Sequence, residues 1–354
     1  MQVRSLKYAS PFIVYAAACL AFLHAGWVIF LPLLYAWVFI PLAELLVHPD
    51  PSNMDATQEA LAKKDPLYDF WLYLIVPFQY AALWLFLSSM QTPGQPWWMV
   101  IGRIFDMGLL CGVFGINVAH ELGHRSTKME KWMAKALLLT SLYIHFFIEH
   151  NKGHHKRVST PEDPASARYG ENIYRFFLRT IKGSYLSAWA IQQKELDRKK
   201  LPFLSLHNQM LMFQMIQTFL LILIMIIFGW TSLLSFIGAA AIGALLLETV
   251  NYIEHYGLQR RSNQAGGYER VMPEHSWNSD HVLGRLTLFE LSRHSDHHFQ
   301  SSRKYQVLRR HDRTPQMPTG YPGMMILALF PPAWFLIMNR ELSKLHNQRS
   351  KRIE

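Results

Sequence analysis

Long apolar runs alternate with polar, basic stretches along the chain. Crossing the hydrocarbon core of a bilayer takes about 20 apolar residues, and runs of about that length recur six times. They cover residues 9–24, 27–46, 69–89, 97–119, 209–228 and 233–253. This pattern predicts an all-α integral membrane protein built as a six-span helical bundle. No cleavable signal-peptide pattern is evident, so we expect the first span to remain as an anchor.

Basic residues fall on one side of this pattern. The turns at residues 24–26, 91–96 and 229–232 contain no Lys or Arg. The positive-inside rule therefore places these turns outside, and places both termini and the regions 120–208 and 254–354 in the cytoplasm. The net charge of +10 is then mainly a topology signal, and nucleic-acid binding is not expected.

Three further segments need separate interpretation. Residues 131–147 are apolar enough for another span, but a shared histidine site requires them to lie along the membrane interface or to turn back. Residues 172–201 are basic and aromatic-rich, which predicts a cytoplasmic helix resting on the headgroups. Residues 324–338 are interrupted by two prolines and are too short and kinked for a seventh span. With no internal repeat, we expect a single integral membrane domain, residues 1–354, with a cytoplasmic histidine-rich di-metal cap.

Polar residues in and between the spans carry smaller expectations. Arg103 and Asp106 are three residues apart in an apolar helix and predict an internal charge pair. Cys19 and Cys111 both fall inside expected spans, so neither a disulfide framework nor a cysteine-ligated metal is expected. Residues 47–67 have the turn chemistry of a loop without catalytic function.

Histidines occur at metal-ligand spacings in three short stretches, namely His120 and His124, then His150, His154 and His155, then His294, His297 and His298. Residues four apart share one face of an α-helix, so the imidazoles of a stretch can converge on one ion. A ninth candidate, His255, follows a carboxylate at the end of an apolar run. Eight or nine imidazoles exceed the four to six ligands of one ion, so the sequence predicts a two-metal site.

Span length supports a shared site. A helix over residues 97–119 measures about 34 Å, which brings His120 to the cytoplasmic boundary. An equal length, residues 232–254, precedes His255. Of the remaining histidines, His275 and His281 are candidates for groups that orient the ligands. The others are expected to be ordinary polar or packing residues: His24, His48, His145, His207, His311 and His346.

The chemistry of the site has two early alternatives. The stretch from His120 to His124 also matches the H-E-x-x-H pattern of zinc proteases, but such a zinc needs only one more protein ligand. A metal transporter would instead require histidines deep within several spans. A histidine-rich pair of ions at the mouth of a membrane bundle suits O₂ activation against an apolar substrate, and iron is the natural metal because zinc has no redox chemistry.

At these motifs the chain resembles the membrane-bound alkane monooxygenases (AlkB-type alkane hydroxylases), within the wider group of membrane desaturases and hydroxylases. The resemblance is close at residues 120–124, 145–155, 251–258 and 293–298, and extends to residues 160–165, 275–279 and 318–323. It implies terminal hydroxylation of medium-chain n-alkanes to 1-alkanols, using O₂ and a non-haem di-iron centre of two iron ions. By position, the implied catalytic metal ligands are His120, His124, His150, His154, His155, His255, His294, His297 and His298.

The resemblance also implies an electron donor, rubredoxin, itself reduced by a reductase, and a location in the bacterial inner membrane. A fatty-acyl desaturase or an alkyl-aromatic hydroxylase on the same scaffold is the nearest alternative. We expect a substrate channel among the spans whose depth is set by bulky side chains such as Trp37, Phe39, Phe78 and Tyr80. We expect an acidic donor to dock on a basic cluster formed by Lys152, Lys156, Arg157, Arg168, Arg175, Arg179 and Lys182.

Overall fold

The chain folds into helices joined by irregular loops. The computed structural model describes residues 3–264 and 266–350, and within these ranges there is no β-strand, only two isolated bridges. Five helical stretches are long and apolar enough to cross a membrane: Arg4–Leu23, Trp27–Leu46, Pro66–Ser89, Trp97–Gly123 and Gln209–His255. The all-α membrane architecture is therefore confirmed, with the first four spans close to the predicted runs.

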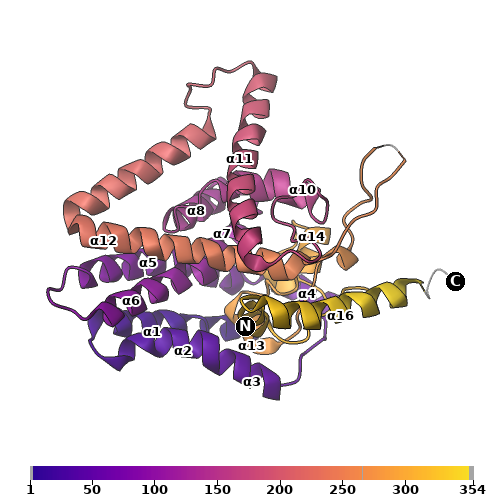
Figure 1. Cartoon of the computed structure of the whole chain (residues 1–354), viewed down its shortest axis with the longest axis horizontal. Helices are drawn as coiled ribbons and strands as arrows, with labels where there is room; N and C mark the ends of the chain where they lie inside the picture. The colour runs from indigo at the N-terminus through magenta and orange to yellow at the C-terminus, as the bar shows by residue number, and fades with distance from the viewer. Residues whose placement is uncertain (1–2, 265, 351–354) are drawn as a thin grey trace.

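The last two predicted spans form one 47-residue helix, α12 (Gln209–His255). Its backbone leaves helical geometry at Gly229, with φ 77° and ψ −178°, a conformation open to glycine because it has no side chain. Figure 1 shows α12 as two arms that meet at a sharp bend. The structure thus has five helices of spanning length, and the fifth bends at the beginning of the predicted turn 229–232.

The N-terminal hairpin is assembled from short helical pieces. They are η1 (Val3–Ala9), α1 (Phe12–Leu23), η2 (Trp27–Phe30), α2 (Leu31–Leu34), η3 (Tyr35–Phe39) and α3 (Ile40–Leu46). Gly26, with φ 87°, precedes the second half. Beside this hairpin lie α5 (Pro66–Ser89), α6 (Trp97–Leu110), η4 (Cys111–Ile116) and α7 (Asn117–Gly123). Both cysteines are free, as predicted.

Small residues let α12 approach α6 and η4 closely. A Cβ at Gly108 would lie 2.5 Å from the Ile242 side chain, and one at Gly243 would lie 2.6 Å from Cys111. Such close approach is how helices gain packing energy in a bilayer, where neighbouring lipid is as apolar as the helices. This contact fixes the two histidine-bearing ends, α7 and the end of α12, relative to each other.

Arg103 and Asp106 in the fourth span are both buried and attract each other electrostatically, as the predicted internal charge pair requires, but they are not in direct contact. No ion pair within 4 Å joins Arg103 and Asp106 among the described residues. Arg103 instead donates to the backbone carbonyls of Ala21 (3.0 Å) and His24 (2.8 Å) and to the Gln95 side chain (2.8 Å). Carbonyls at helix C-termini have no partner within the helix, so a neighbouring guanidinium satisfies them.

The segment 131–147 turns back, as the shared site requires. It runs through α8 (Lys128–Leu139), reverses near Leu142, which has φ 51°, and enters α9 (Phe146–Glu149). Thr127 is the N-cap of α8, because its hydroxyl accepts from the Glu130 backbone N–H, and the same hydroxyl donates to the Glu130 carboxylate. The chain continues into η5 (His150–His154) and α10 (His155–Arg157).

The remaining helices cover the histidine end of the bundle. The predicted helix over 172–201 is confirmed as α11 (Ile173–Lys199), whereas the predicted loop 47–67 contains a helix, α4 (Ala56–Lys64), begun by an Asp55 cap. The C-terminal part holds η6 (Pro273–His275), α13 (Val282–Thr287), α14 (His294–Phe299), η7 (Tyr305–Val307), α15 (Tyr321–Ala328) and α16 (Pro331–Ser350). Residues 324–338 are shared between α15 and α16 and form no span, as predicted.

Candidate di-metal site

All nine predicted ligands lie together at one end of the bundle, where Figure 1 shows α7, α10 and α14. They form two groups, and within each group one ring nitrogen per histidine lies within 4.8 Å of all the others. The five-histidine group contains His120, His124, His150, His155 and His297. The four-histidine group contains His154, His255, His294 and His298.

The Nε2 atoms of the five-histidine group point at one another. His120 lies 2.7 Å from His297, and His124 lies 3.1 Å from His150. His155 closes the ring, 2.9 Å from His150 and 3.1 Å from His297. Two ligand atoms about 2.1 Å from an ion and at right angles to each other are about 3.0 Å apart, so these distances fit ligands around one ion.

The four-histidine group is more deeply buried. His298 Nε2 lies 3.2 Å from His154 Nε2 and 2.8 Å from His294 Nε2. The His255 ring centroid lies 5.0 to 5.2 Å from those of the other three. His255 is the last residue of α12, so the span itself delivers this ligand candidate.

The second histidine stretch divides between the two groups, which corrects the expectation that its three imidazoles converge on one ion. Residues His150–His154 form a turn of π-helix rather than α-helix. The wider turn aligns His150 with His155, whose Nε2 atoms are 2.9 Å apart, and directs His154 to the other group. Such π turns occur often at functional sites.

Asp163 orients His154. Its Oδ2 lies 2.9 Å from His154 Nδ1, and it also accepts from the Ser166 hydroxyl at 2.6 Å. Placing the proton on Nδ1 leaves the Nε2 lone pair free for a metal. Burial opposes protonation of His154, but the Asp163 carboxylate outweighs burial, so the pKa of His154 is raised. The sequence offered one signal for Asp163, because it lies in the stretch 160–165 that resembles the family.

The surroundings of the five-histidine group favour neutral imidazoles. Burial, followed by the charge of neighbouring histidines, lowers the pKa of His124 to about 3. The same causes hold the pKa values of His150, His155 and His297 well below the usual value. Neutral imidazole is the form that binds metal, so the five-histidine group can bind an ion at neutral pH without first losing protons.

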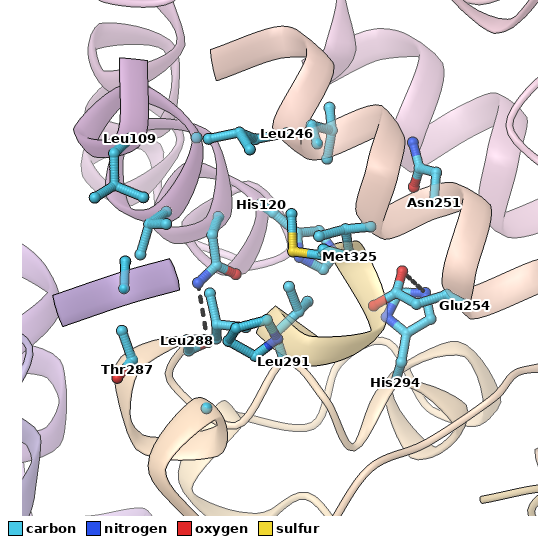
Figure 2. A pocket seen from close by; sticks show the side chains of 18 of the residues that line it. Leu109, His120, Leu246, Asn251, Glu254, Thr287, Leu288, Leu291, His294 and Met325 are labelled. Atoms are coloured by element: carbon cyan, nitrogen blue, oxygen red, sulfur yellow. Dashed lines mark hydrogen bonds and ion pairs between the residues drawn. The ribbon is translucent and has the colours of Figure 1, made fainter. Parts of the chain in front are cut away.

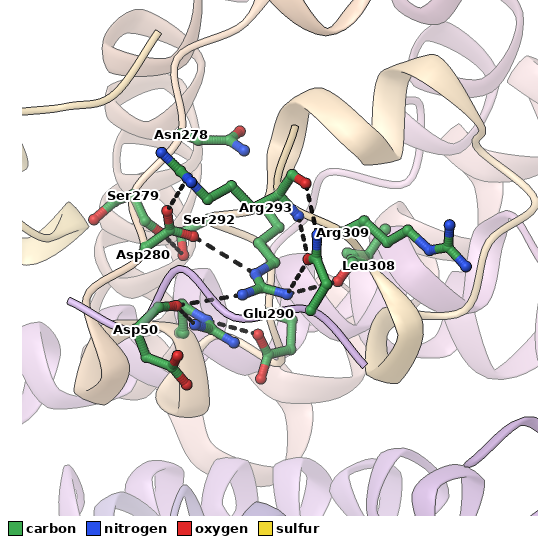
Figure 3. A network of polar contacts seen from close by, with 12 residues as sticks. Asp50, Asn278, Ser279, Asp280, Glu290, Ser292, Arg293, Leu308 and Arg309 are labelled. Atoms are coloured by element: carbon green, nitrogen blue, oxygen red, sulfur yellow. Dashed lines mark hydrogen bonds and ion pairs between the residues drawn. The ribbon is translucent and has the colours of Figure 1, made fainter. Parts of the chain in front are cut away.

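Helix α14, which carries His294, His297 and His298, is held by a network of polar and ionic contacts that the sequence did not predict. Figure 3 shows Arg293 at its centre, donating to the Leu308 carbonyl (2.9 Å). Arg293 also donates to the Ser52 carbonyl (2.7 Å). Asp296, fully buried, accepts from the Arg309 backbone N–H at 2.8 Å and contacts His311 Nε2 at 2.7 Å. His311, expected to be an ordinary polar or packing residue, therefore helps to hold this helix, and the segment 47–67 anchors the site through Ser52.

The two candidates for orienting groups contact other partners. His275 accepts from the Met272 backbone N–H at 3.0 Å and its Nε2 lies 3.2 Å from Glu269. His281 Nδ1 lies 3.0 Å from the Ser279 hydroxyl. Both side-chain contacts tie down loop 257–281, and the His275 backbone is in addition a hydrogen-bond partner of the His255 ring.

Glu121 is engaged elsewhere, which weighs against a zinc protease. Its carboxylate pairs with Arg125 at 2.7 Å and accepts from the Tyr305 backbone N–H at 3.2 Å. A protease would need this carboxylate as a general base toward metal-bound water. The histidines also lie at the ends of helices, with His120 in the last turn of α7 and His255 at the end of α12. A transporter would place them deeper.

An apolar cavity leads to both groups. The residues that line it include Trp37, Leu109, Leu246 and Met325, and also His120, His150, His294, Asn251 and Glu254. Figure 2 shows Glu254 against the His294 ring. His120 and His150 belong to the five-histidine group, whereas His294 belongs to the four-histidine group. An apolar chain in this cavity would present its end to both.

Of the four side chains expected to set the channel depth, only Trp37 lines this cavity. Phe39 and Phe78 are 55% and 41% exposed on the outside of the bundle, and the Tyr80 hydroxyl donates to the Ala136 carbonyl. The expectation failed for these three because bulk alone does not reveal which face of a span looks inward.

The predicted basic cluster is only partly free. Lys152, Arg157 and Arg179 are paired with Glu195 (2.5 Å), Glu149 (2.6 Å) and Glu171 (2.7 Å). The other four are exposed, and no ion pair to them occurs among the described residues: Lys156, Arg168, Arg175 and Lys182.

Comparison with known proteins agrees with this geometry. The family model described as fatty acid desaturase matches residues 95–328. Alkane 1-monooxygenase 2 of Alcanivorax borkumensis is 38% identical over 309 residues, covering 86% of this chain and 81% of the relative. Alkane 1-monooxygenase 2 of Pseudomonas aeruginosa is 41% identical over 302 residues, covering 85% and 80%. The xylene/toluene monooxygenase hydroxylase component of Pseudomonas putida is 27% identical over 260 residues, covering 71% and 66%. At this identity and coverage, the chain belongs to the alkane 1-monooxygenases, within the wider fatty acid desaturase family.

Proposed function

We propose that this membrane enzyme hydroxylates the terminal carbon of medium-chain n-alkanes at a di-iron centre, with O₂ as oxidant and rubredoxin as electron donor. The observation that carries the proposal is the meeting of two histidine groups with one apolar cavity. All nine histidines would serve as ligands, five to one iron and four to the other. Iron fits because imidazole suits it and because, unlike zinc, it supplies the redox chemistry that O₂ activation needs.

The protein's own residues position the substrate. Trp37, Leu109, Leu246 and Met325 surround an unbranched chain with apolar surface and exclude water from it. The end methyl then faces His120, His150 and His294, so the carbon that reacts is chosen by which part of the chain reaches the irons. The reaction consumes O₂, two electrons and two protons for each alcohol and water formed, and the electrons come from a separate carrier.

The proposal also includes the number of membrane crossings and the side of the membrane on which the histidine end lies. If the bend at Gly229 separates two crossings within α12, the five helices of spanning length would make six crossings. With six crossings and the Lys and Arg distribution, both termini and the histidine end face the cytoplasm, where rubredoxin is available. The membrane is the bacterial inner membrane. Cysteine labelling of single variants in the turn 91–96 and at the histidine end tests the orientation, because only the first should react from outside intact cells.

The decisive test combines metal analysis with product analysis. Purified enzyme should hold two irons per chain and, given rubredoxin and its reductase, should convert n-octane to 1-octanol with O₂ incorporation. Absence of iron, or bound iron without hydroxylation across an alkane series, would refute the proposal.

Relatives with other names define the competing outcome. The resemblance to a xylene/toluene monooxygenase component favours a test with p-xylene, and the desaturase family model favours a test with fatty-acyl substrates. An aromatic methyl group or an acyl chain preferred over octane, identified by mass spectrometry of the products, would reassign the substrate while leaving the metal site in place.

A further inference from the structure

Glu254 lies beside the four-histidine group and faces the cavity. It directly precedes His255 at the end of α12, and only 1% of its surface is exposed. It is the one carboxylate among the residues that line the apolar cavity. Figure 2 shows its carboxylate joined to the His294 ring.

The distance from Glu254 to His294 matches the distances between the histidines themselves. Glu254 Oε2 lies 3.0 Å from His294 Nε2, and the same Nε2 lies 2.8 Å from His298 Nε2. Two ligand atoms about 2.1 Å from one ion and at right angles are about 3.0 Å apart. The carboxylate oxygen is therefore spaced from His294 as a neighbouring ligand would be, although it lies outside the set of four ring nitrogens that are all within 4.8 Å of one another.

Among the described residues, no positively charged side chain forms an ion pair with the Glu254 carboxylate. The Tyr321 hydroxyl donates to Oε1 at 2.9 Å, which fixes the carboxylate and directs Oε2 toward the histidines. No Lys or Arg among the described residues pairs with Glu254. A buried carboxylate without a partner charge costs several kcal/mol, and a divalent ion would offset that cost.

Two other buried carboxylates show the contrast. Glu248, on the same helix, accepts from Tyr143 (2.9 Å) and Thr180 (2.8 Å), and Glu121 pairs with Arg125. Each of these is satisfied by protein donors and contacts no ring of the histidine groups. Glu254 has one protein donor and one imidazole nitrogen that is itself a candidate ligand atom.

We propose that Glu254 is a protein ligand of the ion held by His154, His255, His294 and His298, so that each ion has five protein donors. This inference rests on the proposed di-metal function. It makes the two ions chemically different, because one has only neutral imidazole ligands and the other has an anionic oxygen ligand that also borders the substrate cavity.

Substitution at Glu254 with a matched control tests the assignment. In Glu254→Gln a neutral amide replaces the anionic carboxylate while the size is kept, so we expect binding of the second iron to weaken about tenfold or more, with the iron of the five-histidine group retained. X-ray absorption should show a lower average number of nitrogen and oxygen ligands per iron. The control, Glu248→Gln, removes a buried carboxylate from the same helix and should keep two irons with unchanged coordination.

Glu254→Gln with two tightly bound irons and wild-type coordination would overturn the assignment and leave Glu254 as a hydrogen-bond acceptor that orients His294. If the Glu254→Gln variant holds no iron at all, a measurement on the wild-type protein tests the assignment instead. Its infrared difference spectrum between metal-free and iron-loaded states should contain a shifted carboxylate stretch, and the absence of that shift overturns the assignment. A wild type without metal would instead refute the proposed function itself.

Discussion

The two histidine groups differ in what surrounds them. In the five-histidine group, His124 and His155 are half-buried, and imidazoles supply every candidate ligand. In the four-histidine group all members are buried, and the carboxylates of Asp163 and Glu254 lie against their rings. The chain has thus built one neutral group close to the surface and one sealed group with negative charge beside it. Two ions in these places would differ in access, charge and proton coupling.

The largest expected effect comes from removing one imidazole from each group. We predict that His255→Ala and His124→Ala each reduce turnover about 100-fold or more, because both irons are needed, yet each variant should lose a different iron. Iron per chain and Mössbauer spectra of the two variants would show complementary losses. Full iron content and activity in His255→Ala would remove this residue from the ligand set.

A smaller effect is expected from the carboxylate that orients His154. We predict that Asp163→Asn weakens iron binding in the four-histidine group about 10- to 100-fold and leaves the five-histidine group intact, because outer partners fix the tautomer and raise ligand basicity. Stepwise removal of iron by a chelator would measure this. Glu171→Gln is the control, since Glu171 is a nearby buried carboxylate paired with Arg179. Equal loss from both groups would contradict the separation.

The sequence predicted which nine histidines lie together but not their division into two groups. Ligand chemistry dictates histidines at helical spacing, and this pattern is visible without a structure. The split of His150 from His154 depends on a π turn, which α-helical periodicity does not reveal. The contacts of Glu254 with Tyr321 and His294 join residues far apart in the chain, so only the fold brings them together.

The fold shows the same limit. Apolar length predicted the spans, because a bilayer imposes it, but the hydrogen bonds of Arg103 to the Ala21 and His24 carbonyls join separate segments and could not be predicted. The helix α4 was missed because its turn-rich approach, residues 49–53, dominated the interpretation, although Asp55 is a good N-cap. Inward and outward faces of a span carry similar apolar residues, which is why Trp37 was the only correct choice among four cavity candidates.

A pH titration should separate the two groups further. The pKa of His154 is raised by Asp163, so below that pKa iron must displace a proton and its affinity for the four-histidine group falls, by about tenfold per pH unit for one proton. The five-histidine group has lowered pKa values, about 3 for His124, so its affinity should stay constant between about pH 8 and pH 6. Metal titrations over this range provide the measurement, and earlier loss from the five-histidine group would contradict the comparison.

The cavity can be altered without touching either group. We predict that Trp37→Ala admits longer alkanes, because the indole is the largest of the side chains that line the cavity. One methylene is worth only about 0.8 kcal/mol, so the limit on length must come from steric exclusion. Product profiles over an alkane series would report the shift, with iron content unchanged. Phe39→Ala and Phe78→Ala are controls, since both side chains are exposed on the outside of the bundle. The same shift in a control would place the channel elsewhere.

The smallest expected effect concerns electron entry. We expect electrons to enter at the five-histidine group, because His124 and His155 are less buried than the other ligand candidates. Arg175 and Lys182 are exposed on α11 and carry no ion pair among the described residues. We predict that paired Arg175→Glu and Lys182→Glu raise the half-saturating rubredoxin concentration several-fold, with both irons retained. Turnover should also fall with added salt, as the Debye length shortens from about 10 Å at 0.1 M to about 3 Å at 1 M.

Arg179→Glu is the contrasting control. Arg179 donates hydrogen bonds to Glu171 and to the Ser166 carbonyl, so this change should lower the stability of the protein instead. Indifference to both salt and charge reversal would mean that this charge serves the anionic lipid surface rather than the donor.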